Sequence, residues 1–197
     1  MSADSSIKNT LGLILAGGRS SRMGVDKSTL SLSGESFLQL AIKRFESIGI
    51  HNYVVSSNSL EGAMADRLFD KGPLAALDAL LNLPQSRLNN VDGVLVVPID
   101  MPLFPAASLK QLALQGAERH FACYFRSHPM PFFIQLDAQF AATLKQQIES
   151  DDRSIFSLLK KLSAVEINYN KGQIAKDAFY NVNTPEQMQK VEQMNQC

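Results

Sequence analysis

The chain alternates between short apolar runs and longer amphipathic segments, and this pattern predicts strands that alternate with helices. Apolar runs bounded by turn residues predict strands at 13–16, 53–55, 67–70, 93–97, 121–125, 132–136, 165–167 and 179–183. Apolar residues at helical spacing predict helices at 37–48, 73–83, 105–115, 137–149 and 154–162, and a last one that begins at Pro185.

This order of elements predicts an α/β fold over residues 1–197 as a single domain. The expected architecture has three layers: a Rossmann-like, doubly wound and mostly parallel sheet, with right-handed crossovers to helices on both faces. The run at 93–97 is apolar throughout, which is typical of a central strand that helices cover on both sides. The segment 126–131 is too rich in proline for regular structure, and the part from 120 to 170 is expected to form a small antiparallel extension over the site.

The composition is that of an ordinary soluble protein, with 197 residues, 45% hydrophobic residues, 19% charged residues and a formal net charge of +0. A nucleic-acid-binding protein would have a basic excess, so we expect no nucleic-acid partner. The polar segment 1–10 has no apolar run like that of a signal peptide, and no stretch is long enough to span a membrane, which favours a cytoplasmic location. The cysteines, Cys123 and Cys197, form neither a disulfide framework nor a metal-binding spacing.

The richest chemistry lies in the loop that follows the first strand, where glycines, serines, arginines and a lysine are close together. Glycines let backbone N–H groups approach phosphate oxygens, and the basic side chains supply the charge that a triphosphate requires. The loop is not a P-loop, because Lys27 follows Asp26 instead of a glycine. It also lacks the Rossmann fingerprint, because Gly17 and Gly18 are adjacent.

The pattern Leu-Ala-Gly-Gly-x-x-x-Arg-Met-Gly-x-Asp-Lys at 15–27 resembles the opening motif of nucleotidyltransferases, and in this form that of the molybdenum cofactor guanylyltransferases. The segments 72–76, 100–102 and 181–186 are similar to further motifs of this family, although Ala76 stands where the family has glycine. The resemblance implies Mg²⁺-dependent transfer of GMP from GTP to the phosphate of molybdopterin or molybdenum-molybdopterin, with release of pyrophosphate. Three alternatives stay open: a cytidylyltransferase of molybdopterin, another nucleotidyltransferase, and a pterin carrier without catalysis. Molybdoenzyme apoproteins as recipients of the product stay open as well.

Asp100 is the expected metal ligand, because it ends a buried strand, precedes a Met-Pro pair and carries the oxygen ligands that Mg²⁺ prefers. Taken alone, it would be read as a turn or helix-capping aspartate. The resemblance gives it the magnesium role. Lys27 and Arg22 are expected to join it as catalytic residues that neutralise phosphate charge, Lys27 as a compact point charge and Arg22 as a planar fork.

The resemblance also implies a nucleotide site, in which two segments, 15–18 and 72–76, help to select guanine. The residues expected to bind the nucleotide are Leu15, Ala16, Gly17, Gly18, Lys27, Ser56, Asn58, Asp70, Gly72, Pro73, Leu74, Asp100 and Asn183. Among them, Ser56, Asn58 and Asp70 are alternatives for one nucleoside contact. Asn183 could complete either the metal site or the site of the pterin phosphate. His128 and Arg153 are the candidates on the pterin side.

Overall fold

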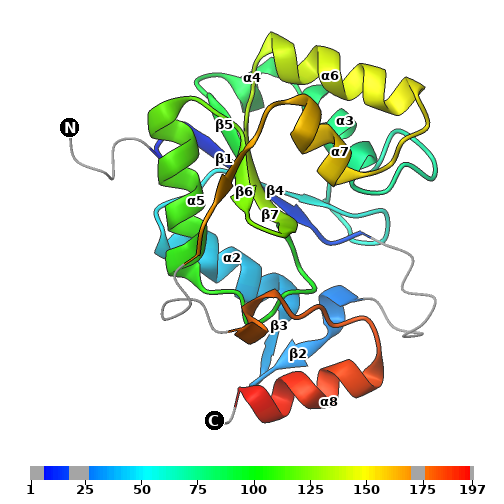
Figure 1. Ribbon diagram of the computed structural model, residues 1–197. Helices are drawn as coiled ribbons and strands as arrows, with labels where there is room; N and C mark the ends of the chain where they lie inside the picture. Colours follow the sequence, from blue (N-terminus) through cyan, green and yellow to red (C-terminus); the bar gives the residue numbers. More distant parts are fainter. Residues whose placement is uncertain (1–6, 18–26, 170–175, 196–197) are drawn as a thin grey trace.

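A six-stranded sheet forms the centre of the computed structural model, which describes residues 7–17, 27–169 and 176–195 (Figure 1). Across the sheet, the strands are β4 (Tyr53–Ser56), β1 (Thr10–Leu15), β5 (Gly93–Pro98), β7 (His128–Gln135), β6 (Cys123–Phe125) and β8 (Val165–Ile167). β7 runs antiparallel to β5 and β6, and the other pairings are parallel. The predicted α/β fold with a mostly parallel sheet is therefore confirmed.

Helices cover both faces of this sheet and give the fold its three layers. The elements α2 (Phe37–Ser47) and α5 (Ala106–Arg119) pack on one face, and α3 (Pro73–Leu81), α6 (Ala138–Glu149) and α7 (Ile155–Lys161) pack on the other. Alternate residues of β1 serve the two cores: Ile14 belongs to the first and Leu13 to the second. Gly12 permits a close approach, because a Cβ there would stand 2.5 Å from the Phe45 ring of α2.

Local sequence signals set the starts of most helices. Ser36 forms a capping box with Gln39 at the start of α2, and the side chains of Asp137 and Ser154 cap α6 and α7. Pro73 lies in the first turn of α3, where a backbone N–H would have no intrahelical acceptor, so the N–H that proline lacks costs no hydrogen bond. These signals explain why the predicted helix starts lie within a residue or two of the observed ones.

A short hairpin and the last helix extend one end of the molecule, below the sheet in Figure 1. A hairpin joins β2 (Ser31–Leu32) to β3 (Glu35–Ser36), preceded by the 3₁₀ helix η1 (Lys27–Thr29). α8 (Pro185–Met194) lies at this same end, where the Asn195 amide donates to the Ser33 hydroxyl at 2.9 Å. The remaining short elements are α4 (Gln85–Leu88) and the 3₁₀ helix η2 (Lys176–Phe179).

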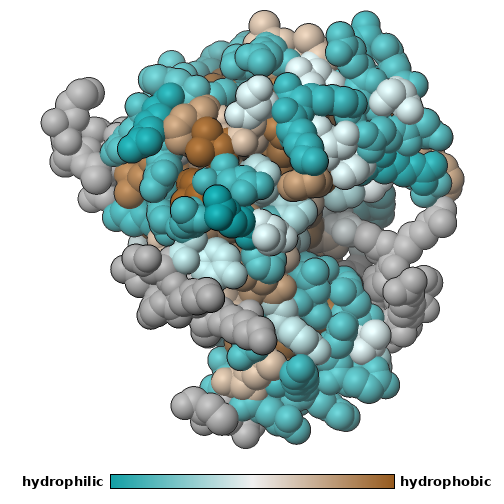
Figure 2. Space-filling model, viewed as in Figure 1, coloured by the Kyte–Doolittle hydropathy of each residue, from teal (hydrophilic) through white to brown (hydrophobic). Residues whose placement is uncertain are grey.

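Buried apolar side chains fill both cores, and the face shown in Figure 2 is mostly hydrophilic. Within the described ranges, no helix combines the length and the apolar character that crossing a bilayer requires.

Four details of the predicted elements are wrong. Residues 67–70 form bends and turns instead of a strand, and 179–183 contain the end of η2 and irregular backbone. α5 continues to Arg119, beyond the predicted end at 115. β7 begins at His128, inside the proline-rich segment that was expected to be irregular.

β7 accommodates its prolines through an irregular register. Phe132 pairs with Tyr124 of β6, whereas the next pair joins His128 to Phe125, so the intervening residues of β7 are bulged out. Pro129 and Pro131 lie in this bulge, where the loss of a backbone donor breaks no ladder hydrogen bond with β6. The antiparallel part expected near the site is therefore a strand of the main sheet, and its first residues reach the site.

Candidate active site at the carboxyl edge of the sheet

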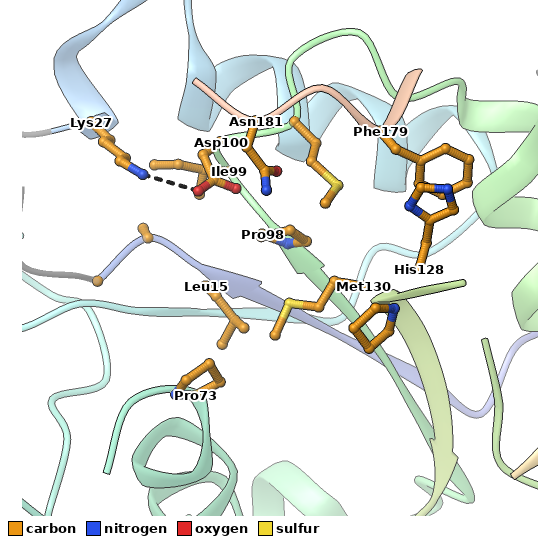
Figure 3. Close-up of a pocket in the computed structure, with 14 residues that line it drawn as sticks. Leu15, Lys27, Pro73, Pro98, Ile99, Asp100, His128, Met130, Phe179 and Asn181 are labelled. Carbon is orange, nitrogen blue, oxygen red and sulfur yellow. Dashed lines mark hydrogen bonds and ion pairs between the residues drawn. The ribbon is translucent and has the colours of Figure 1, made fainter. Parts of the chain in front are cut away.

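A cleft of about 350 Å³ opens at the carboxyl ends of β1 and β5 (Figure 3). The chain leaves β1 toward β4 on one side and later returns to β5 on the other, so this edge is the switch point at which α/β sheets bind ligands. The residues that line the cleft are Leu15, Ala16, Gly17, Lys27, Pro73, Pro98, Ile99, Asp100, Met101, His128, Pro129, Met130, Phe179 and Asn181. The cleft therefore brings the pterin-side candidate His128 together with six of the residues expected to bind the nucleotide: Leu15, Ala16, Gly17, Lys27, Pro73 and Asp100.

Backbone hydrogen bonds fix the floor of this cleft. Ala16 N–H donates to the Ser56 carbonyl at 2.9 Å, and Ile99 N–H donates to the Leu15 carbonyl at 3.2 Å. A Cβ on Gly17 would lie 3.7 Å from its nearest described neighbours, which is ordinary contact. A side chain at position 17 would therefore not clash with these neighbours. Glycine at this position leaves the backbone accessible from the cleft.

Three polar side chains from distant parts of the chain meet beside the cleft. Lys27 Nζ donates to Asp100 Oδ2 at 2.9 Å, and it also donates to Asn183 Oδ1. The Lys27 and Asp100 side chains are 20% and 22% exposed, so water reaches them only in part. Lys27 starts η1, Asp100 follows β5 and Asn183 precedes α8, which means that the fold alone unites them.

The carboxyl-terminal segment is tied to the strand end that carries Asp100. Val182 N–H donates to the Asp100 carbonyl at 2.8 Å, and Asn183 N–H donates to Gln187 Oε1 at 2.6 Å. Thr184 caps α8 by accepting a hydrogen bond from the Gln187 N–H, as its position before Pro185 predicts. Asn183 therefore lies beside Asp100 because its neighbours hold it there.

A second support of the Asp100 loop is Arg44, which the sequence pattern did not single out. This α2 side chain donates from Nη2 to the Pro102 carbonyl. Burial lowers the pKa of the Arg44 guanidinium to about 10, so it is still charged at neutral pH. Its only sequence signal is a basic residue on a helix that otherwise turns apolar residues toward the core, which is too common a feature to reveal the contact.

Aromatic rings form another wall of the cleft. The His128 ring stacks on Phe179 with centroids 3.7 Å apart and an interplanar angle of 9°. Tyr169 contacts both rings, at 6.0 Å and 5.3 Å between centroids. Burial lowers the pKa of His128, which favours a neutral imidazole at pH 7. Phe179 and Asn181 are lining residues that the predicted site did not include. Asn181 is the first residue of the segment 181–186 that resembles a family motif, and Phe179 lies two residues before it.

Ser56 and Asn58 lie off the lining of the cleft and brace the loop after β4. Asn58 Nδ2 donates to Asp66 Oδ2 at 3.0 Å and Asn58 Oδ1 accepts from Asp66 N–H at 2.8 Å. The Ser56 hydroxyl, which is buried, donates to Asp66 Oδ1 at 3.4 Å. Their assignment to the nucleotide stays a prediction.

Asp70 and Arg153 form an ion pair with each other at 2.8 Å, next to the start of α3. Gly72 lies between Asp70 and Pro73 in the chain and has a φ of +54°, a conformation that glycine adopts most readily. The Leu74 side chain is fully buried in the second core, so only its backbone could face a ligand. Gly18 and Arg22 lie outside the described residues.

Known proteins share the sequence pattern and the fold of this chain. The family model described as a MobA-like NTP transferase domain matches residues 12–165. A molybdenum cofactor guanylyltransferase of Xanthomonas euvesicatoria pv. vesicatoria is 35% identical over 179 residues, covering 89% of this chain and 90% of that protein. One of Rhizobium johnstonii is 31% identical over 195 residues, covering 92% and 90%.

Solved structures share the fold at lower sequence identity. Molybdopterin-guanine dinucleotide biosynthesis protein A from Archaeoglobus fulgidus has a TM-score of 0.72 at 19% identity, covering 94% of this chain and 98% of that one. The 2-C-methyl-D-erythritol 4-phosphate cytidylyltransferase from Thermus thermophilus has a TM-score of 0.64 at 14% identity, again covering 94% and 98%.

Proposed function

The chain belongs to the family of MobA-like NTP transferase domains, and we propose that it transfers GMP from GTP to the phosphate of molybdopterin, with or without molybdenum. The product would be the guanine dinucleotide form of the cofactor, and pyrophosphate would be released. Two relatives named molybdenum cofactor guanylyltransferase, both at least 31% identical over about nine-tenths of the chain, support this choice of substrates. The observation that carries the proposal is the meeting of Lys27, Asp100 and Asn183 at the edge of one cleft.

In the proposed reaction, a phosphate oxygen of molybdopterin attacks the α-phosphorus of GTP. The new P–O bond forms as the bond between the α-phosphorus and its bridging oxygen to the β-phosphorus breaks, and the electron pair leaves with pyrophosphate. An ionised phosphate needs no general base, so the chain's task is to position the reactants and offset their charge. Lys27, with its compact ammonium group, would offset charge on the phosphates of GTP.

The oxygen atoms beside Lys27 fit a magnesium ion. Asp100 Oδ2 and Asn183 Oδ1 both accept from the same Nζ, so both oxygens face one point that a cation can occupy. Mg²⁺ typically takes one or two carboxylates together with substrate phosphates, which suits a single aspartate and an amide oxygen. Asp100 and Asn183 would hold the ion, which when bound would add positive charge next to the phosphates.

The two ends of the cleft suit the two substrates. We assign guanine to the segments 15–18 and 72–76. Ser56, Asn58 and Asp70 are alternative nucleoside contacts, and Arg22 is a second phosphate ligand. Figure 3 shows Pro73 and the His128–Phe179 stack on different walls. The stack and Asn181 would face the second substrate, since a planar heterocycle packs well against an aromatic wall. Arg153 is paired with Asp70 instead of lining this wall, which makes it the weaker candidate for the pterin.

The decisive experiment incubates the purified protein with each of the four nucleoside triphosphates, Mg²⁺ and molybdopterin, and measures pyrophosphate release and the dinucleotide product. We expect product with GTP alone. Consumption of CTP without GTP would replace the proposal with a cytidylyltransferase, and pterin binding without pyrophosphate release with any triphosphate would favour a carrier. Asp100→Ala should abolish release while folding is retained, whereas Glu118→Gln, an exposed carboxylate on α5, should leave it unchanged.

A further inference from the structure

We propose that Lys27 is an exchangeable cation that holds the metal site until the nucleotide arrives, so that the divalent metal enters with the nucleotide instead of before it. This inference rests on the proposed function. It concerns the order of binding, which the proposed reaction leaves open. In the nucleotide-free protein, the Lys27 ammonium satisfies Asp100 and Asn183; in the complex, the triphosphate draws it away and exposes both oxygens.

The contacts of Lys27 carry the first step. Its Nζ donates to Asp100 Oδ2 at 2.9 Å and to Asn183 Oδ1, the same two oxygens that fit a magnesium ion. A divalent cation that binds there must first break both hydrogen bonds, or else lie against a like charge. The ammonium therefore competes directly with the metal for its protein ligands.

The charge of the described lining supplies the second step. Among the described lining residues of the cleft, Asp100 carries the one carboxylate and Lys27 the one permanent positive charge. Their charges cancel, so the described part of the site offers a free divalent cation little net attraction. Mg²⁺ also releases its water reluctantly and usually relies on substrate phosphates for several of its contacts.

The placement of Lys27 supplies the third step. It begins η1, directly after the residues 18–26 that are expected to cradle the triphosphate. Its side chain has four rotatable carbon–carbon bonds and ends in a compact charge, so Nζ can move from one acceptor to another without a change in the fold. A triphosphate offers several negative oxygens in place of one carboxylate, which favours the exchange.

Mn²⁺ binding, followed by electron paramagnetic resonance of the free ion, tests the order without any measurement of turnover. Wild-type protein should bind Mn²⁺ weakly alone and at least tenfold more tightly with GTP, after subtraction of the Mn²⁺ that GTP binds in a protein-free control. Lys27→Met should bind Mn²⁺ about tenfold more tightly than wild type without GTP, because one charge-assisted hydrogen bond to Asp100 no longer competes. Adding Asp100→Asn to Lys27→Met should remove this gain, which would locate the ion at Asp100.

The matched control is Lys43→Met, since the Lys43 side chain is 63% exposed and pairs with Glu35 on the surface; it should leave Mn²⁺ affinity unchanged. Circular dichroism checks folding, and Lys27→Gln takes the place of Lys27→Met if the latter does not fold.

Equal or weaker Mn²⁺ binding by the Lys27 variant, or equally tight wild-type binding with and without GTP, overturns the inference. Because the comparison without nucleotide involves no transfer, it gives its answer even if the true nucleotide is CTP. If wild-type protein transfers GMP normally but the Lys27 variant has the same Mn²⁺ affinity as wild type, the proposed order of binding is refuted while the proposed function stands.

Discussion

One buried aromatic ring packs directly against two glycines, and this contact leads to a sharp prediction. Phe133 of β7 is fully buried between Gly93 of β5 and Gly116 of α5. A Cβ added to Gly116 would stand 2.1 Å from Cδ1 of the ring, and one added to Gly93 would stand 2.2 Å from Cζ. Because the ring is enclosed by protein, it cannot swing into solvent to relieve such a clash. We therefore predict that Gly116→Ala destabilises the protein.

The magnitude follows from two opposing effects. Alanine inside a helix is more favourable than glycine by about 1 kcal/mol. Overpacking of a core costs about 1–3 kcal/mol, and a separation of 2.1 Å argues for the upper end. The expected loss in free energy of unfolding is therefore about 2 kcal/mol, which corresponds to about 4–8 °C in Tm for a domain of this size.

Urea and thermal unfolding would measure this loss in a cycle with Phe133→Leu, which shortens the clashing side chain. Gly116→Ala should cost less in the Phe133→Leu background, with a coupling energy of about 1–2 kcal/mol. Ala107→Gly, at an exposed position of the same helix, measures the alanine–glycine difference without a clash. A Gly116→Ala protein as stable as wild type, or an equal cost in both backgrounds, would refute the packing argument.

Three further predictions concern single side chains. Burial lowers the pKa of His128, so the imidazole binds a proton more readily in the unfolded chain than in the folded one. The free energy of unfolding should therefore fall as pH drops from 7 toward 5. In His128→Asn, the urea midpoint should depend less steeply on pH than in wild type. Burial raises the pKa of the Cys123 thiol to about 12, so iodoacetamide should label it only after denaturation, as peptide mapping would reveal; labelling of the native protein would contradict this. Arg44→Met should lower turnover about tenfold with stability changed by about 1 kcal/mol or less, whereas Arg44→Lys keeps part of the activity in steady-state assays; a silent Arg44→Met would remove its role in placing the Asp100 loop.

Local patterns in the sequence were sufficient for most of the fold, since periodicity and caps act over a few residues. The error at 67–70 shows the limit of such patterns. Leu68 and Phe69 made this stretch look like a strand, yet Phe69 is 87% exposed and the chain turns at Asp70 with φ of +58°. An apolar residue that tertiary structure leaves in solvent cannot be told from a buried one by composition. The prolines of β7 led to a wrong prediction of irregular structure for a related reason. The register shift that accommodates them depends on the pairing with β6, which local sequence does not reveal.

The candidate site likewise contains residues that local sequence indicated and residues that only tertiary contacts reveal. Residue type and motif indicated the chemistry of Lys27 and Asp100, but only the fold brings Asn183 to Lys27 across 156 positions of the chain. Arg44 and Phe179 were not in the predicted site because their roles depend on contacts with distant backbone and rings. The sequence thus indicated the charged groups of the proposed site, whereas the contacts that hold them in place depend on the folded structure.

This division has a physical counterpart in the cleft itself. The end of β1 is fixed by backbone hydrogen bonds to its neighbours, which suits the recognition of a rigid base. The charges, in contrast, meet through the long side chain of Lys27 and an amide on a tethered segment, and such contacts can exchange partners without a change in the fold. The proposed reaction, which brings in a highly charged nucleotide and releases pyrophosphate in every cycle, would need both properties. The rigid floor would set which nucleotide binds, and the exchangeable lysine would set when the metal joins it.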